Sequence, residues 1–136
     1  MKTAFKLIFI LAVFHSAMLS AQSEISTEEI KLKNDSILLP GTLTYKKKLD
    51  KQALVIYVHG SGNVDRNGNQ AGAVKANYIQ QLSEALNENG IAFYRYDKRT
   101  STKENMKFLM QGISFLDFVE DVKVAVTHFK DDLRFS

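Results

Sequence analysis

Residues 53–62 read ALVIYVHGSG, and this stretch decides the fold predicted for the 136-residue chain. Its first six residues, Ala53 to Val58, are apolar without alternation, and three of them are β-branched. Such a run is typical of a strand that is covered on both faces, usually in a parallel sheet. The two glycines that follow allow a sharp turn with free backbone N–H groups. Because open α/β sheets present the carboxyl ends of their strands to the ligand crevice, His59-Gly60-Ser61-Gly62 is the first candidate site.

A helix and a second strand follow this loop. After a polar segment from Asn63 to Gly72, apolar residues recur at helical spacing, which predicts a helix from Val74 to Glu88 that Asn89-Gly90 ends with a left-handed turn. Residues 91–94 predict a second buried strand, and the charged sequence RYDKR follows at 95–99. Strand, helix and strand at this spacing predict a βαβ unit with parallel strands and a right-handed crossover.

An antiparallel segment precedes this unit. Alternating apolar and polar residues over 29–39, with a turn at 34–35, predict a short hairpin. Pro40-Gly41 interrupts the pattern, which resumes at Leu43 and Tyr45. A proline at such a position is typical of antiparallel edge strands.

A second long helix is expected near the C-terminus. Ser114 and Asp117 form a capping-box pattern, and apolar residues follow at helical spacing, so the helix covers roughly residues 115–131. Residues 106–110 predict a short helical turn before it. The expected fold class is therefore α/β, with an antiparallel hairpin, a βαβ unit of parallel strands and then a helix.

The first residues predict a secretory signal peptide over residues 1–21. Lys2 and Lys6 precede or flank the apolar run 7–14, and small residues follow up to Ala21. The run is short for a bilayer span, so an uncleaved anchor is the lesser alternative and no membrane span is expected after cleavage. Residues 22–28 are expected to be a polar leader before a partial domain at 29–136. The protein is expected to be secreted or periplasmic.

The composition limits the chemistry that the chain can perform. Lys and Arg number 18 against 15 Asp and Glu, 45% of the residues are hydrophobic, and Cys is absent. One folded domain is expected, without disulfides, thiol nucleophiles or Cys-ligated metals. His15, His59 and His128 are scattered, so neither a metal site nor a cofactor is predicted. The lysine cluster at 46–51 is typical of a solvated loop, and no nucleic-acid partner is expected.

Nucleotide and calcium binding are alternatives that the motifs fit poorly. No Gly-Lys-Ser/Thr follows Gly62, and Asp65 stands where a dinucleotide fingerprint needs glycine. Residues 65–70 superficially match a calcium loop, but Gln70 and Ala76 occupy the positions that need glycine and a bidentate acid. The free backbone amides of the loop therefore suit a developing oxyanion better than a phosphate.

The order of these motifs resembles the N-terminal part of an α/β-hydrolase. A hairpin containing LPGTL at 39–43, ALVIYVHGSG at 53–62, an amphipathic helix, GIAFYRYDKR at 90–99 and a helix rich in Asp follow one another. The chain is most similar to secreted esterases and prolyl-oligopeptidase-like serine hydrolases, over residues 30–133. The resemblance implies a small-molecule ester or peptide substrate for the full-length relative.

The resemblance also implies roles for individual residues. In this family the loop after the strand supplies an oxyanion-hole amide, which corresponds to the backbone N–H of Ser61, with His59 and Gly60 shaping the turn. Asp97 and His59 precede the family's nucleophile, so they do not match its acid and base. They are expected to belong to a structural hydrogen-bond network with Arg95, Lys98 or Arg99.

The chain departs from the family pattern in two places. Thr100-Ser101-Thr102-Lys103 replaces a glycine-containing turn after Arg99, and no G-x-S-x-G nucleophile elbow occurs. The resemblance puts the elbow a few residues beyond Ser136, and the acid and base after it, so no member of the triad is expected within the chain. The family's strand order then leaves residues 53–58 as a bare apolar edge, which predicts low stability for the chain alone.

The predicted function is that of the N-terminal segment of a serine-dependent hydrolase acting on an ester or amide bond. Such a segment carries the oxyanion-hole loop but lacks the triad, so it is expected to be inactive alone. The alternative is a secreted, non-catalytic binding module whose loop from Asn63 to Gly72 contacts a ligand or another chain.

Overall fold

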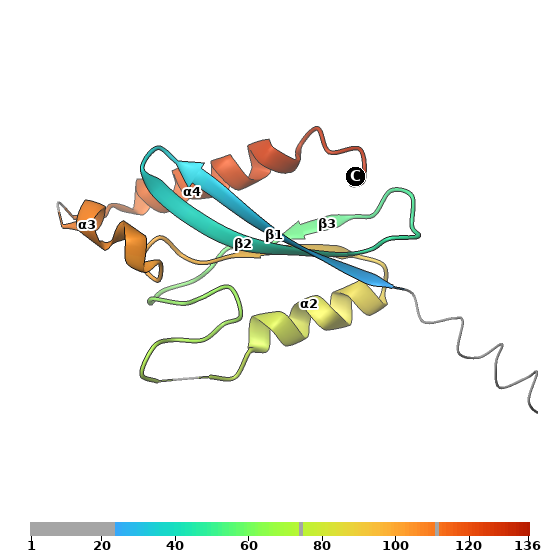
Figure 1. Ribbon diagram of the computed structural model, residues 1–136, viewed down its shortest axis with the longest axis horizontal. Coiled ribbons are helices and arrows are strands. Elements are labelled where there is room, and N and C mark those ends of the chain that lie inside the picture. The colour runs from blue at the N-terminus through green and yellow to red at the C-terminus, as the bar shows by residue number, and fades with distance from the viewer. Residues whose placement is uncertain (1–23, 74, 111) are drawn as a thin grey trace, which may run out of the picture.

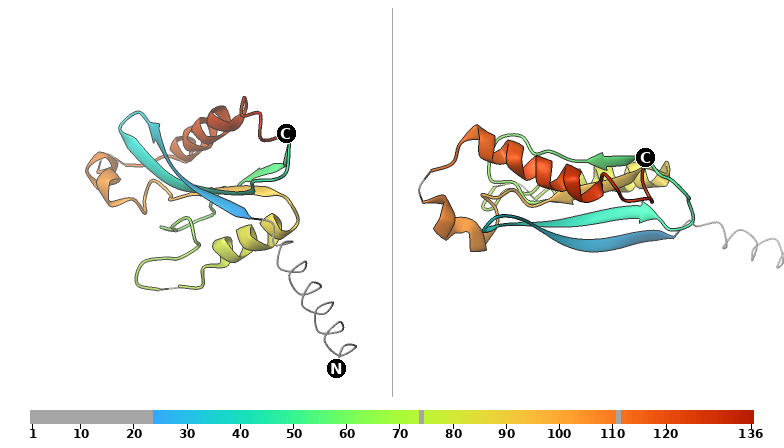
Figure 2. Two further views of the ribbon diagram at one scale, coloured as in Figure 1. Left: turned by 45° about the vertical axis from the view of Figure 1, so that its right-hand side comes forward. Right: turned by 90° about the horizontal axis from the view of Figure 1, so that it is seen from above.

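The computed structural model describes residues 24–136 except 74 and 111, so the predicted signal peptide lies outside the described residues. Four strands form one sheet in the order β1-β2-β4-β3. They are β1 (Ile25–Asn34), β2 (Ile37–Lys46), β3 (Leu54–Ile56) and β4 (Ala92–Tyr96). The helical elements are α2 (Tyr78–Glu88), the 3-10 turn η2 (Lys103–Asn105), α3 (Met106–Leu109) and α4 (Phe115–Phe129). Helix α4 lies over one face of the sheet and α2 over the other (Figures 1 and 2).

The β1–β2 hairpin is longer than the sequence pattern predicted. Its pairs run from Ile25 beside Lys46 to Asn34 beside Ile37, so residues 25–28, expected to be a loose leader, form the start of β1. The expectation of an edge strand at Pro40 is wrong, because β2 lies between β1 and β4. Pro40 is tolerated because pairing of β2 with β4 begins only at Gly41, and the Pro40 carbonyl still accepts a hydrogen bond from the Asp97 N–H.

Strands β3 and β4 are parallel, as predicted, with Leu54 beside Ala92 and Ile56 beside Tyr94. Strand β3 lies at the edge of the sheet, which agrees with the edge position expected for a chain without the nucleophile strand. Burial on both faces was also predicted for this run, and this is wrong, since Val55 is 36% exposed and Val58 is 51% exposed. The physical reason is that, in the described part of the chain, only β4 pairs along the length of β3.

The last residues begin to cover the open edge of β3. Gln52 forms an isolated parallel bridge with Phe135, and its N–H donates to the Arg134 carbonyl at 3.0 Å. Consecutive residues of an extended chain direct their backbone groups to opposite sides. Because the Ala53 carbonyl bonds to β4, Gln52 and Phe135 meet on the side away from β4. The chain at Phe135 therefore runs parallel to β3 along its unpaired side.

Arg134 ties the same C-terminal residues to the first strand. Its guanidinium donates to the Glu28 carboxylate at 2.8 Å, to the Asp132 carboxylate at 2.7 Å, and lies over the Tyr45 ring. Hydrogen bonding to Asp132 raises the pKa of Arg134 above its usual range. These contacts fasten the end of the described chain to the hairpin.

Helix α2 ends where the sequence indicated but begins later, and α4 ends at Phe129, slightly before the predicted residue 131. Helix α2 starts at Tyr78 and not at Val74, because Asn77 has a left-handed backbone (φ 49°) that a helix cannot include. It ends at Glu88, where Gly90 (φ 76°) provides the predicted left-handed stop. Helix α4 begins with the predicted capping box of Ser114 and Asp117.

The sheet separates two apolar layers. On the α4 side, Leu39, Leu43, Tyr94 and Phe129 belong to one buried cluster. On the α2 side, Ile79 and Phe93 form a smaller one with Val64. Alternation along β4 explains the division, because successive side chains of a strand point to opposite faces.

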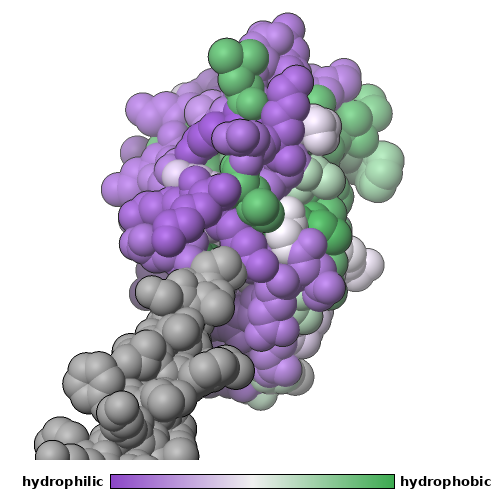
Figure 3. Space-filling model, turned by 90° about the vertical axis from the view of Figure 1, so that its right-hand side faces the viewer, coloured by the Kyte–Doolittle hydropathy of each residue, from purple (hydrophilic) through white to green (hydrophobic). Residues whose placement is uncertain are grey.

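Hydrophobic side chains also remain on the surface. Phe115, Leu116 and Val126 of α4 are exposed, as is Leu133. Hydrophobic surface gathers along one side of the end that carries the C-terminus, whereas most of that view is hydrophilic (Figure 3). None of the helices formed by the described residues is long and apolar enough to cross a membrane.

Gly41 and Tyr94 give a test of the sheet packing. A Cβ atom at residue 41 would lie 2.3 Å from the Tyr94 hydroxyl oxygen and 2.6 Å from its ring. We expect Gly41→Ala to lower the free energy of unfolding by about 1–3 kcal/mol, measured by urea denaturation. The buried Tyr94 hydroxyl has no hydrogen-bond partner in the described part of the chain, so Tyr94→Phe, the control, should leave stability unchanged or raise it. Equal stability of Gly41→Ala and the wild type would contradict this account.

Candidate functional site

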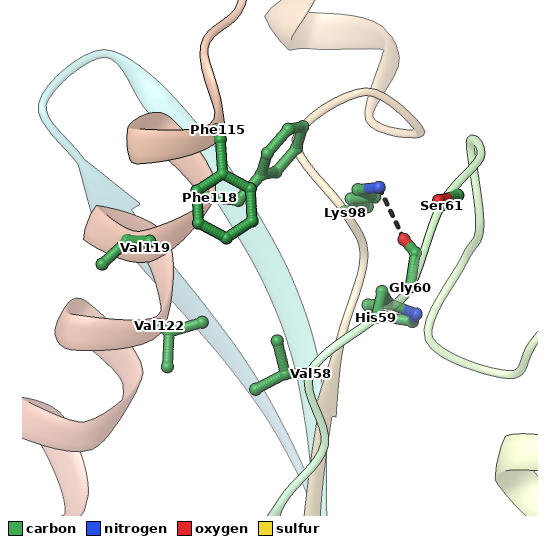
Figure 4. A pocket seen from close by; sticks show the side chains of 9 residues that line it. All are labelled: Val58, His59, Gly60, Ser61, Lys98, Phe115, Phe118, Val119 and Val122. Carbon is green, nitrogen blue, oxygen red and sulfur yellow. Dashed lines mark hydrogen bonds between the residues drawn. The ribbon is translucent and has the colours of Figure 1, made fainter.

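The candidate loop lies where the chain leaves β3, beside the segment that leaves β4. Val58, His59, Gly60 and Ser61 line one side of a cavity of about 340 Å³, and Lys98 lies next to them. Four apolar side chains from one side of α4 complete the lining, namely Phe115, Phe118, Val119 and Val122 (Figure 4). The parallel pairing of β3 and β4 brings the two loops together, as the sequence predicted for the carboxyl edge of the sheet.

Lys98 holds the glycine-containing loop through two backbone carbonyls. Its ammonium group donates to the Gly60 oxygen at 2.8 Å and to the Gly62 oxygen at 3.1 Å. The same group lies 4.5 Å from the centre of the Phe118 ring, a distance at which cation and ring attract each other. Burial lowers the pKa of Lys98 from its ordinary value. Figure 4 shows the Gly60 carbonyl directed at the lysine.

The His59 ring serves the backbone and not the Ser61 hydroxyl. Its Nε2 is in hydrogen-bonding contact with the carbonyl of Tyr96, which can only accept, so Nε2 carries the proton. The other ring nitrogen, Nδ1, is buried without a partner among the described residues. Burial lowers the pKa of His59, although the Tyr96 carbonyl opposes this. His59 therefore fixes the loop to the end of β4, and the burial of its ring disfavours the charged form.

Asp97 binds Arg66 and not the partners expected from sequence. Two nitrogens of the Arg66 guanidinium donate to the two Asp97 oxygens at 3.1 and 2.9 Å, and the Arg66 backbone N–H donates at 2.8 Å. The network with Arg95, Lys98 or Arg99 predicted for Asp97 is therefore wrong about the partner. The bidentate pair fixes the loop that follows Gly62 against the end of β4.

Arg99 forms the most buried ion pair among the described residues. Its guanidinium donates to the two Asp121 oxygens at 2.8 and 2.7 Å, and both residues are 5% exposed or less. Donating these hydrogen bonds to the Asp121 carboxylate raises the pKa of Arg99. Asn34, in the hairpin, donates to the same carboxylate at 2.8 Å. Buried Asn105 joins the network by donating to the carbonyls of Arg99 and Leu38.

The sequence analysis missed three residues that position the site, or left them without a specific partner: Arg66, Lys98 and Asp121. Asp121 had a detectable signal, because it lies four residues before Ala125 and eight before Phe129, on the buried side of α4. An acid at a core position of a helix demands a buried cation. Arg66 and Lys98 gave no comparable signal, since their partners come from loops.

The polar loop from Asn63 to Gly72 is ordered by Asp65. The Asp65 carboxylate accepts hydrogen bonds from the backbone N–H groups of Asn67 and Asn69 at 2.9 and 2.8 Å. Beside it lies a cavity of about 440 Å³ that Thr100, Lys103 and Met106 also line. Residues 24–73, 75–110 and 112–136 contain no group of three His, Asp or Glu side chains placed to hold a metal ion.

A mixed sheet with helices on both faces is consistent with part of an α/β-hydrolase fold, and a comparison with solved structures agrees. A cold-adapted esterase from an Arctic intertidal metagenomic library, in a polyethylene glycol-bound complex, matches with a TM-score of 0.56 at 18% identity. The match covers 80% of this chain and 46% of the esterase, so this chain spans less than half the length of that protein. No protein-family model and no curated protein matches the chain. The likeness shows an esterase-like fold.

The buried ion pair yields a stability prediction. Asp121→Asn leaves the buried Arg99 guanidinium without a buried carboxylate as its partner. We expect a loss of about 3–5 kcal/mol in the free energy of unfolding. The control is Glu120→Gln on the same helix, whose exposed pair with Lys123 should contribute less than about 1 kcal/mol. Similar losses for the two variants would contradict the role given to Asp121.

His59 yields a prediction about pH. Because its pKa in the folded protein is lowered, the unfolded chain binds a proton first as the pH falls below about 6.5. The stability contributed by neutral His59 is thus present above that pH and lost as the pH falls towards the folded pKa. We expect the slope of unfolding free energy against pH between about 6.5 and 5 to flatten in His59→Gln. An NMR titration midpoint of His59 above 6.5 in the folded protein would overturn the assignment.

Proposed function

We propose that this chain is the N-terminal part of a serine-dependent hydrolase that acts on an ester or amide bond. The observation that carries the proposal is the loop His59-Gly60-Ser61-Gly62 at the carboxyl end of a parallel strand, with its carbonyls held by Lys98. The backbone N–H of Ser61 is its oxyanion donor, and His59 and Gly60 shape the turn. Asp97 and Arg99 give structural support.

The chemistry follows from the position of that amide. Attack on an ester or amide carbonyl places a negative charge on the carbonyl oxygen of a tetrahedral intermediate. A fixed N–H group directed at this oxygen lowers the barrier, and one such donor contributes about 3 kcal/mol. Ser61 contributes its amide to this scheme and not its hydroxyl, because His59 donates to a backbone carbonyl and activates no nucleophile.

We propose that the nucleophile comes from a strand that pairs with the open edge of β3. Phe135 already pairs with Gln52 in parallel orientation, and the chain spans 46% of the esterase it is similar to. His59 and Ser61 lie seven and nine residues after Gln52. In unbroken parallel register, a strand continuing from Phe135 therefore reaches the loop about eight residues later. The apolar lining of the cavity along α4 suits the residues of such a strand.

The proposal includes export. Residues 1–21 have the charged, apolar and small-residue order of a signal peptide, which supports secretion or export to the periplasm. The esterase or prolyl-oligopeptidase-like type is proposed from the motifs at residues 53–62 and 90–99. A small-molecule ester or a peptide is the proposed substrate of the full-length protein.

A non-catalytic binding module is the second candidate. The cavity of about 440 Å³ beside the Asn63–Gly72 loop supports it, because amide and hydroxyl side chains there can bind a polar ligand. Both candidates are distinguished by the coding DNA after Ser136. A G-x-S-x-G sequence with its serine about eight residues after Phe135, in frame or after a frameshift, supports the hydrolase. A stop codon followed by unrelated sequence supports the binding module.

An activity assay tests the missing nucleophile. We expect the 136-residue chain to give no turnover of a short-chain nitrophenyl ester above the buffer rate, because the triad is not among its residues. Turnover that a serine-reactive phosphonate abolishes would contradict this prediction. Ser61→Ala is the control, since it removes the hydroxyl and keeps the amide, and any activity lost in this variant would assign Ser61 as a nucleophile.

A further inference from the structure

We propose that Lys98 is the positioning residue of the loop, and that it turns the Ser61 and Asn63 N–H groups to one side as a pair of anion donors. The proposal rests on the proposed hydrolase function, because the anion that these donors would bind is the oxyanion of that reaction. Its test does not require catalysis. It adds the Asn63 backbone N–H as a second donor and explains how Lys98 keeps the loop in one conformation.

The first step is the geometry of the peptide groups. Lys98 holds the carbonyls of Gly60 and Gly62, at 2.8 and 3.1 Å, on its own side of the loop. The peptides of the described residues are all trans. In a trans peptide the carbonyl and the following N–H point in opposite directions. The N–H groups of Ser61 and Asn63 therefore both point away from Lys98.

The second step is that these two N–H groups are free. Among the residues that the structure describes, neither the Ser61 nor the Asn63 backbone N–H donates to a protein acceptor. Ser61 and Asn63 are exposed, so an anion can reach them. Two N–H groups two residues apart that are directed the same way form the kind of concavity that binds an oxyanion.

The third step is that the loop needs an external anchor. Gly60 and Gly62 have no side chains to restrict them, and Gly62 has a φ of 92° that other residues rarely adopt. A loop of this kind has several peptide orientations of similar energy. A single ammonium group that binds both carbonyls selects one of them.

Lys98 is itself fixed well enough to serve as that anchor. Its ammonium lies against the Phe118 ring, and its neighbours Asp97 and Arg99 are tied by ion pairs to Arg66 and Asp121. The Lys98 carbonyl accepts a hydrogen bond from the Ser101 N–H at 2.8 Å. These contacts restrict residues 97–99, so the end of β4 fixes the orientation of the loop peptides through Lys98.

The test is NMR spectroscopy of the 136-residue chain. In Lys98→Met we expect the carbonyl-carbon signals of Gly60 and Gly62 to shift and the backbone order parameters of residues 60–63 to fall from about 0.85 to below about 0.6. Lys107→Met is the matched control, because Lys107 also lies over an aromatic ring, that of Phe108 at 4.8 Å, whereas the two loop carbonyls are bound by Lys98. Lys98→Arg keeps the donors and should restore most of the wild-type order.

The outcomes are separable. Unchanged signals and order parameters at residues 60–63 in Lys98→Met would overturn the proposal. If that variant does not fold, the wild-type protein decides, since scalar coupling between the Lys98 ammonium nitrogen and the two carbonyl carbons is expected and its absence overturns the proposal. Loss of order in the loop together with a full-length protein that hydrolyses no ester or amide would leave Lys98 as the loop's anchor and refute the hydrolase assignment alone.

Discussion

The Arg99 guanidinium and the Asp121 carboxylate, both almost fully buried, join the end of β4 to α4. Asn34 and Asn105 add the hairpin turn and the η2 segment to the same network. Two charges removed from water are tolerated only when their hydrogen bonds are completed, and here each carboxylate oxygen has a donor. The pair thus determines how the hairpin, the central strand and the last helix are arranged. Without it, the carboxyl edge of the sheet would lose its most deeply buried link to α4.

The buried pair also fixes the two charged residues that precede Arg99 in the chain. Asp97 and Lys98 precede Arg99, and successive side chains of an extended chain point to opposite sides, so one binds the loop through Arg66 and the other binds it through backbone carbonyls. The catalytic proposal depends on this arrangement more than on any side chain of the loop itself. A glycine-containing turn is suited to presenting amides only where something else restricts its conformations, and the run 97–99 provides that restriction.

Much of the architecture could be predicted from periodicity. Parallel pairing of the two apolar runs, the capping box at Ser114 and the stop at Gly90 follow from local rules and were confirmed. The inner position of Pro40 could not be predicted, because it depends on where pairing with β4 begins, and the start of α2 depends on the left-handed Asn77. At the site, the sequence indicated the loop but not Arg66 as the partner of Asp97. Such pairings are long-range and have no periodic signature.

The contact between Glu28 and Arg134 joins residues 106 positions apart in the chain. As the chain leaves the ribosome, the β1–β2 hairpin is complete long before its clasp at Arg134 is synthesised. The face of the nascent hairpin that packs against α4, with Leu32 and Leu39 among its buried residues, therefore stays exposed to solvent until α4 and Arg134 have been synthesised. During this interval the growing chain carries an open apolar surface that is able to make non-native contacts.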